Sequence, residues 1–166
     1  MLKTAKEWIQ SLGLLAHAEG GYYKEVLKAQ TNIINDSGDS RPLYTSIYFL
    51  LEHNNPSHFH RLQSDEVWYF HDGAPLTVHM IDAEGTYHSI HLGLDSDQGQ
   101  VLQAVVPKGV IFGSSVEDKD TYSLVSCMVA PGFDYRDFEL FDRETLIQQY
   151  PQHQEIIMQL AFETLD

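Results

Sequence analysis

The feature that most constrains the fold is a series of short strand-like segments with turn signals between them. The segments are rich in β-branched and aromatic residues, and turns such as Asp72-Gly73 and Pro107-Lys108-Gly109 separate them. No helical stretch lies between them, which favours an antiparallel sandwich or barrel over a βαβ fold. The expected strands are 22–29, 43–52, 67–71, 76–82, 87–92, 100–106, 110–114 and 122–130.

Helical patterns occur only at the two ends of the chain. Thr4 and Glu7 have the spacing of a capping box, and Gly13 is a stop signal, so a helix is expected over residues 4–12. Residues 143–165 have apolar side chains at helical spacing, interrupted by Pro151. We therefore expect one domain over residues 1–166, with a barrel at about 20–132 and a C-terminal helical cap.

Charge and composition exclude several partners. The 166 residues carry a formal net charge of -14 and only ten Lys and Arg, which opposes binding to nucleic acid or to an anionic membrane. The sequence has no apolar run long enough to span a bilayer, and its one cysteine, Cys127, lies in an apolar segment. These features predict a soluble cytoplasmic protein with a small-molecule ligand.

Residues 57–73 contain several polar side chains that could act as metal ligands or as an acid and a base. His58 and His60 are two residues apart, so on an extended strand both imidazoles are expected on one face, and Glu66 follows after a turn. Two imidazoles and a carboxylate can hold a divalent transition metal, and one imidazole with a carboxylate can act as an acid-base pair. Both interpretations are open at this point.

This stretch resembles the first cupin motif, in which a His-x-His pair is followed by Glu and, after six intervening residues, by Gly. Glu66 and Gly73 match that spacing, whereas the interval from His60 to Glu66 is one residue longer than usual. The second motif, Pro-x-Gly-x-x-His, is similar to residues 107–112, but Phe112 stands where the metal-binding His is expected. This departure removes one ligand of the usual three-His, one-Glu metal site.

A wider resemblance covers nearly the whole chain and identifies it as a member of the fifth small cupin family, a domain of unknown function. The resemblance implies a jelly roll (double-stranded β-helix) similar to that of the dTDP-4-keto-6-deoxyhexose 3,5-epimerases, usually assembled as a homodimer. It does not imply a known reaction. The matching blocks are residues 19–25, 46–51, 60–61 with 64–68, 106–107, and 130–134 with 137–140.

Three functions are compatible with these residues. The first is a metal-independent epimerase or isomerase acting on a sugar-like or other small polar substrate, with no cofactor. In it His60 is the base, Glu66 orients it or shares its proton, and Tyr48 returns a proton. The second is a binding protein that does not turn its metabolite over, and the third is a metal-dependent enzyme using His58, His60 and Glu66.

Five further residues are expected to contact the ligand. Glu19, Tyr23 and Lys24 flank or follow a Gly-Gly pair, where the backbone can pass close to a ligand, and Lys24 could meet an anionic group. Trp68 and Phe70 share the face of Glu66 by strand alternation, so they form either an aromatic wall over the ligand or part of the core.

Overall fold

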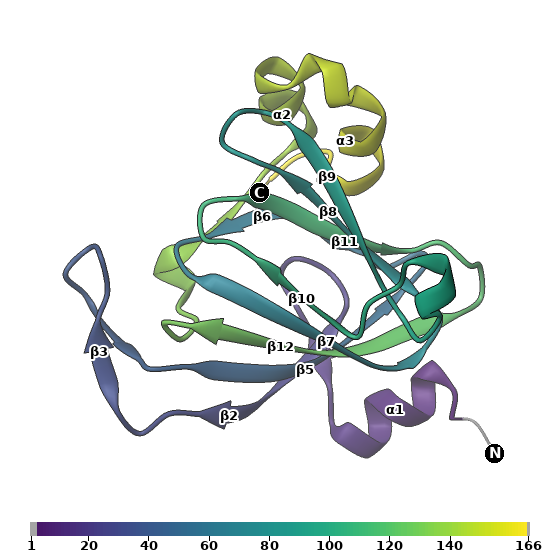
Figure 1. The fold of residues 1–166 in the computed structure, drawn as a ribbon, viewed down its shortest axis with the longest axis horizontal. Coiled ribbons are helices and arrows are strands. Elements are labelled where there is room, and N and C mark those ends of the chain that lie inside the picture. Colours follow the sequence, from purple (N-terminus) through teal and green to yellow (C-terminus); the bar gives the residue numbers. More distant parts are fainter. Residues whose placement is uncertain (1–2, 166) are drawn as a thin grey trace.

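Alternating apolar and polar residues build two antiparallel sheets that face each other, as seen in the computed structural model, which describes residues 3–165 (Figure 1). The larger sheet has six strands in the order β1-β2-β5-β12-β7-β10. Its strands are β1 (Leu15–Ala16), β2 (Tyr22–Lys28), β5 (Thr45–Glu52), β7 (Asp65–Gly73), β10 (Gln103–Val106) and β12 (Tyr122–Ala130).

The second sheet has five strands in the order β13-β6-β11-β8-β9. Apart from the β8–β9 hairpin, neighbouring strands in this sheet are distant in sequence, as in a jelly roll, because the chain passes repeatedly from one sheet to the other. Its strands are β6 (Ser57–Leu62), β8 (Leu76–Ile81), β9 (Tyr87–Leu92), β11 (Ile111–Val116) and β13 (Phe138–Leu140). The expected cupin jelly roll with terminal helices is confirmed.

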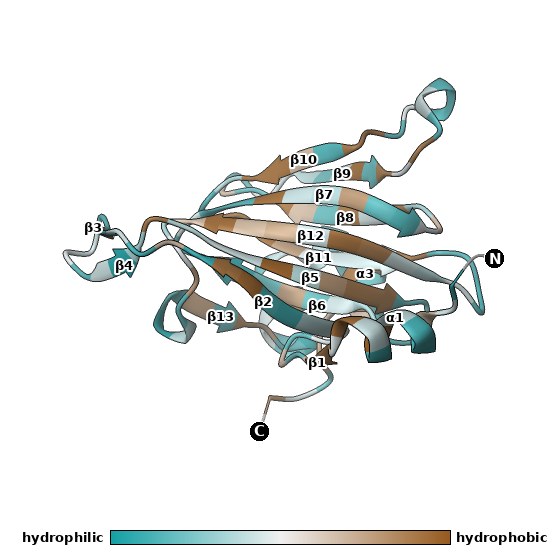
Figure 2. Ribbon diagram, turned by 90° about the horizontal axis from the view of Figure 1, so that it is seen from below, coloured by the Kyte–Doolittle hydropathy of each residue, from teal (hydrophilic) through white to brown (hydrophobic). Residues whose placement is uncertain are grey.

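The inner faces of the two sheets form the main core. In β5, Phe49 and Leu51 point inward and meet Val78 and Phe112 of the other sheet, whereas Leu50 points outward. Figure 2 shows hydrophobic residues along most strands of the six-stranded sheet. One side of this sheet therefore encloses the barrel, and the other supports the N-terminal helix.

The N-terminal helix α1 (Ala5–Leu12) covers the outer face of β5 and β12. The expected capping box is present, with Thr4 and Glu7 exchanging hydrogen bonds, and Gly13 ends the helix in the left-handed region at φ 66°. Trp8 anchors the helix, because its indole Nε1 donates to Asp72 Oδ2 at 2.9 Å.

The C-terminal helices cover the outer face of the five-stranded sheet, at the top of Figure 1. Their apolar side chains, with Leu146 at the centre, meet Phe59 and Ile111 of the strands. The helices are α2 (Arg143–Gln149) and α3 (Gln154–Leu160), and the 3-10 turn η3 (Pro151–His153) joins them. Two other 3-10 turns lie in loops between strands: η1 (Ser96–Gln98) after β9 and η2 (Tyr135–Asp137) after β12. Within residues 3–165, no helix has the length and apolar character needed to cross a bilayer.

The structure differs from the sequence-based expectation in two short segments. Residues 31–41 form a projecting hairpin, β3 (Asn32–Ile34) and β4 (Ser40–Pro42), joined by a turn that contains Gly38. Polar composition made this hairpin look like a loop, because a two-stranded ribbon outside the barrel needs no buried face. The three-residue strand β13 is too short to show a periodicity.

Leu146 provides a test of how the helical cap is held. Its side chain is fully buried, so Leu146→Ala should lower the free energy of unfolding by about 3 kcal/mol through lost burial and a residual cavity. Met158→Ala, at an exposed position of α3, is the control and should change it by about 0.5 kcal/mol or less. Urea unfolding followed by circular dichroism measures both, and equal effects would contradict this account of the cap.

Candidate functional site

A cavity of about 490 Å³ lies inside the barrel at the end where β5 and β7 begin and β12 ends. This volume is in the usual range of about 300–1,000 Å³ for small-molecule sites. Tyr23, Thr45, Glu66 and Cys127 come from the six-stranded sheet, and Leu62 comes from β6 of the opposite sheet. Two loops, before β2 and after β12, complete the wall.

Glu19 contributes a buried carboxyl group to this wall from the loop before β2. The first strand of the opposite sheet holds its side chain, since Ser57 Oγ of β6 donates to Glu19 Oε1 at 2.9 Å. Glu19 Oε2 lies 3.3 Å from His60 Nε2 and 3.6 Å from His17 Nδ1. A buried carboxyl group needs such partners, and here they also fix its direction.

The tautomer of His60 follows from its other nitrogen. His60 Nδ1 lies 2.7 Å from the carbonyl oxygen of His58, which can only accept, so Nδ1 carries the proton. In the neutral ring, Nε2 is therefore an acceptor that faces Glu19. Burial lowers the pKa of His60 to about 4, and burial raises the pKa of Glu19 against the opposing effects of His17 and Ser57. Both shifts favour the uncharged pair, in which Glu19 carries the shared proton, over an ion pair.

A β-bulge in β6 explains why Ser57 and His60 both reach Glu19. Phe112 of β11 pairs with His60 and Ser114 pairs with Ser57, so Gly113 alone faces the two residues in between. A side chain at Gly113 would come within 2.8 Å of the Ser57 carbonyl oxygen, which makes glycine necessary there. The bulge breaks the simple alternation of side chains along β6.

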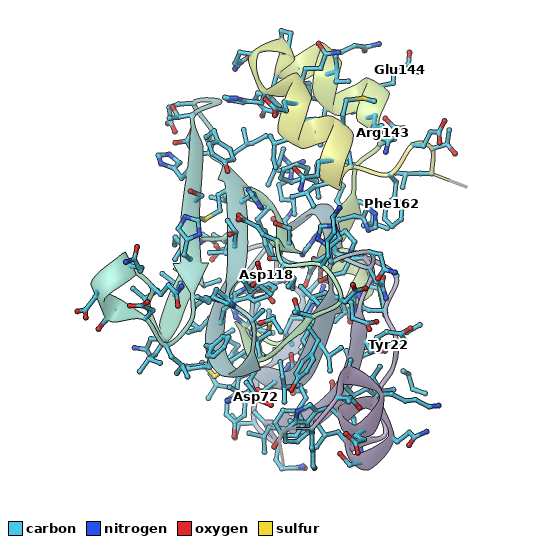
Figure 3. The ribbon with its side chains drawn as sticks, turned by 90° about the vertical axis from the view of Figure 1, so that its right-hand side faces the viewer. Tyr22, Asp72, Asp118, Arg143, Glu144 and Phe162 are labelled. Carbon is cyan, nitrogen blue, oxygen red and sulfur yellow. The ribbon has the colours of Figure 1, made fainter. Side chains whose placement is uncertain are left out.

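His58 consequently lies away from the cavity. Its ring stacks on Phe162, with centroids 3.9 Å apart, and Phe162 is seen just below the C-terminal helices in Figure 3. Both the backbone N–H and Nδ1–H of His58 donate to the carbonyl oxygen of Glu19 at 2.7 Å. The expectation that the imidazoles of His58 and His60 converge is wrong, because the bulge separates them; His58 instead holds the backbone of Glu19.

Cupins with a three-His, one-Glu site hold a metal, so we tested the donors present here. Phe112 occupies the position of the second-motif His and lies against His60, with ring centroids 4.1 Å apart. Across residues 3–165, no three His, Cys, Asp or Glu side chains are grouped closely enough to hold a metal ion. The set His58, His60 and Glu66 does not fit such a site.

Glu66 is the second buried carboxyl group of the wall. Burial and, to a lesser extent, the nearby Glu19 raise the pKa of Glu66 to about 8, and a hydrogen bond from the Cys127 thiol opposes the increase. Burial and Glu66 in turn raise the pKa of Cys127. Near neutral pH, Glu66 is therefore mainly a neutral acid that faces the cavity.

The other sequence-predicted residues are divided between cavity, core and surface. Tyr23 lines the cavity, whereas Trp68 and Phe70 lie further along β7 in the core between the sheets. Tyr48 packs on the outer face near α1, and Lys24 Nζ donates to the Leu12 carbonyl oxygen at the end of α1 at 3.0 Å. Tyr48 and Lys24 do not reach the cavity because their neighbours in the alternation, Ile47 and Tyr23, point inward.

Several lining residues were not foreseen from the sequence. His17 lies in the loop before β2, and its Nδ1 accepts from the Glu19 N–H at 3.2 Å. Phe133, Asp134 and Tyr135 come from the loop after β12. The 130–134 block of the family resemblance pointed to Phe133 and Asp134, but no local pattern around His17 or Tyr135 indicates that these two residues share a cavity.

The fold defines a jelly-roll barrel of the cupin class, and its cavity has the volume of a small-molecule site. The family described as Cupin superfamily (DUF985) matches residues 6–141. The chain belongs to this family.

Known structures and sequences agree with that assignment. A hypothetical protein from Leishmania major is 45% identical, with a TM-score of 0.93 over 97% of this chain and 100% of its own. A Shewanella oneidensis protein is 46% identical, with a TM-score of 0.89 over 96% and 98% of the two chains. An uncharacterized Saccharomyces cerevisiae protein is 31% identical over 81% of this chain and 73% of its own length.

More distant structures share only the fold. A variant of Bacillus subtilis oxalate decarboxylase is 16% identical, with a TM-score of 0.56 over 90% of this chain and 37% of its own. This similarity carries no information about substrate or chemistry.

Replacing Glu66 tests its protonation. Folded Glu66 keeps its proton up to about pH 8, whereas the unfolded residue loses it at about pH 4.3, so folding retains a proton between these values. Stability from this group must therefore fall as pH rises through that window. Relative to Glu66→Gln, the wild type should lose about 2 kcal/mol or more of unfolding free energy between about pH 5 and pH 8.5.

The comparison isolates Glu66 from an opposing effect. Because the pKa of His60 is lowered by burial, His60 makes stability rise with pH between about 4 and 6.5, in wild type and variant alike. Glu84→Gln, in an exposed turn, is the matched control and should leave the pH dependence unchanged. Parallel wild-type and Glu66→Gln curves from urea titrations would contradict the raised pKa of Glu66.

Proposed function

We propose that this protein is a metal-independent isomerase that moves a proton on a small polar ligand held in the cavity. Glu19 and Glu66 are the two groups that face the ligand, and His60 stands behind Glu19. The observation that carries the proposal is the 3.3 Å contact between Glu19 Oε2 and His60 Nε2 in the buried wall. A carboxyl group with a neutral imidazole behind it can both give and take a proton.

The proposed reaction uses these groups in turn. Transfer of the Glu19 proton to His60 Nε2 leaves a carboxylate, which removes a proton from a ligand carbon next to a carbonyl group. Glu66, as a neutral acid, gives its proton to the carbonyl oxygen, so an enol forms without a free charge on oxygen. For an α-hydroxy carbonyl ligand the enol is an enediol, and Glu19 returns its proton either to the same carbon or to the former carbonyl carbon. Glu66 takes back the proton of the hydroxyl that becomes the carbonyl group, and return of the His60 proton to Glu19 restores the starting state.

The roles assigned to His60 and Tyr48 differ from the sequence-based hypothesis. His60 is fully enclosed and acts through Glu19, so it is a positioning residue and proton partner. Tyr48 lies on the outer face, so Glu19 itself returns the proton to carbon. His58 contributes by holding the Glu19 backbone.

Deuterium exchange tests this function even when the product is unidentified. Neutral and amino-substituted sugars in deuterated buffer should incorporate deuterium next to the carbonyl group when the wild-type protein is present, as measured by NMR. Glu19→Gln should slow incorporation about 100-fold or more, because Gln cannot exchange a proton with the ligand. His60→Asn should slow it less and should change its pH profile.

His79→Asn is the matched control. Burial also lowers the pKa of His79 to about 4, but its ring is bonded to Ser115 and Tyr87 on the outer face of β8. The His79→Asn variant should catalyse deuterium incorporation at the wild-type rate. A ligand that binds with no exchange would favour a non-catalytic binding protein, and unchanged exchange in Glu19→Gln would refute the assigned mechanism.

A further inference from the structure

The charge of the cavity wall is one-sided. No Lys or Arg among residues 3–165 lines it, whereas four carboxyl groups do: those of Glu19, Glu25, Glu66 and Asp134. Asp134 is already paired with Arg136, whose Nη2 lies 2.8 Å from Asp134 Oδ2 outside the cavity lining. Glu19 is engaged by Ser57 and His60. Glu66 and Glu25 are the carboxyl groups left to meet a ligand.

Glu66 has unused hydrogen-bonding capacity. The residue is only 6% exposed, and in the described part of the chain its carboxyl group has no nitrogen or oxygen donor, only the thiol of Cys127. A buried carboxyl group normally has stronger partners than a thiol. The empty side of this group faces the cavity, so a polar group of the ligand would complete it.

Aromatic rings surround the same space. His17 and Tyr23 meet edge to face with centroids 4.5 Å apart, and Phe133 and Tyr135 do so at 5.0 Å. His17 and Tyr135 are stacked at 6.3 Å. We call Tyr23, Phe133 and Tyr135 with His17 the aromatic cluster. Rings that meet at steep angles present several π faces to one volume, which is how proteins hold organic cations.

We infer that the ligand of this cavity is a small organic cation, a protonated amine or a quaternary ammonium compound. Its charged group lies against the aromatic cluster and the carboxyl group of Glu25, and Glu66 meets the uncharged polar part of the ligand. This inference deepens the proposed function, because it names the substrate class of the same site.

Anionic ligands fit the wall poorly. A phosphate group would enter an enclosed space beside several carboxyl groups, without the Arg or Lys that usually binds it. The resemblance to nucleotide-sugar epimerases concerns the fold, and the cavity lining among residues 3–165 holds no cationic side chain for a pyrophosphate.

Paired probes separate charge from shape. Choline and 3,3-dimethylbutan-1-ol have nearly the same size, but only choline is charged, and isothermal titration calorimetry can compare their affinities at low salt. Choline should bind about 10-fold more tightly or better, and inorganic phosphate should not compete. Equal affinity of the neutral alcohol, preferential binding of phosphate, or no choline binding at about 10 mM would each overturn the inference.

Variants of the cavity lining test whether choline binds in this cavity. Tyr135→Leu and Glu25→Gln should each weaken choline binding about 5-fold or more and leave the weak binding of the alcohol nearly unchanged. Tyr87→Leu removes a tyrosine from the outer face of β9 and should have no effect. Unchanged choline affinity in both cavity variants would place the cation elsewhere and overturn the inference.

These experiments can refute the cation inference and the isomerase proposal independently of each other. Cation binding without deuterium exchange on an amino-substituted sugar would leave the inference intact and contradict the isomerase proposal. Deuterium exchange restricted to neutral sugars, with no preference for choline over the neutral alcohol, would support the isomerase proposal and contradict the cation inference.

Discussion

The buried Glu19 carboxyl group is the interaction on which the site depends, because it joins the two sheets at the cavity. Glu19 precedes β2 of the larger sheet, whereas Ser57, His58 and His60 belong to β6 of the smaller one. Ser57 and His60 hold the carboxyl group, and His58 holds the carbonyl oxygen of the same residue. Loss of these contacts would leave a buried acid unpaired and release the loop that closes the wall.

Gly20 shows how tightly this junction is built. Its φ is 109°, and a side chain there would come within 2.0 Å of the Pro56 carbonyl oxygen. Only glycine allows the chain to turn between Glu19 and β2 at this approach. The backbone direction that brings Glu19 to His58 is therefore encoded next to Glu19 itself.

The departures from the cupin metal motif make physical sense together. Phe112 replaces one imidazole with a ring that packs on His60, and the bulge at Gly113 turns His58 toward Phe162. What remains is the buried imidazole of His60. Burial disfavours its charged form, but the neutral ring can accept a hydrogen bond from the protonated carboxyl group of Glu19. The motif histidines that remain thus serve Glu19: one holds its backbone and the other its carboxyl group.

Strand positions were predictable because turn signals and β-branched or aromatic residues mark most strands, and β9 and β12 have the bounds expected from them. It was less predictable which face of each strand points into the barrel. Alternation shows that Tyr48 and Phe49 face opposite ways, but which one faces the cavity depends on the sheet that covers it. The bulge at Gly113 depends on a pairing between β6 and β11, about fifty residues apart in sequence, which no local pattern encodes.

Contacts across long sequence separations also decided the cavity lining. Of the residues proposed from the sequence, Glu19, Tyr23 and Glu66 line the cavity, and His60 lies behind Glu19. His17 and Tyr135 lie in loops at opposite ends of the barrel sequence and meet only after both sheets have formed. Loop residues of this kind carry no periodicity, so their place in the site could not be derived.

The most direct test of this account is the protonation state of the His60 ring, measured by nitrogen-15 NMR of protein labelled at histidine nitrogens, with His60→Asn used to assign the signals. The account predicts a neutral ring at about pH 7, protonated at Nδ1 and accepting at Nε2, since burial lowers the pKa of His60 to about 4. The Nε2 signal should shift in Glu19→Gln, which replaces the proton donor. A doubly protonated His60 at about pH 7, paired with a Glu19 carboxylate, would contradict the account.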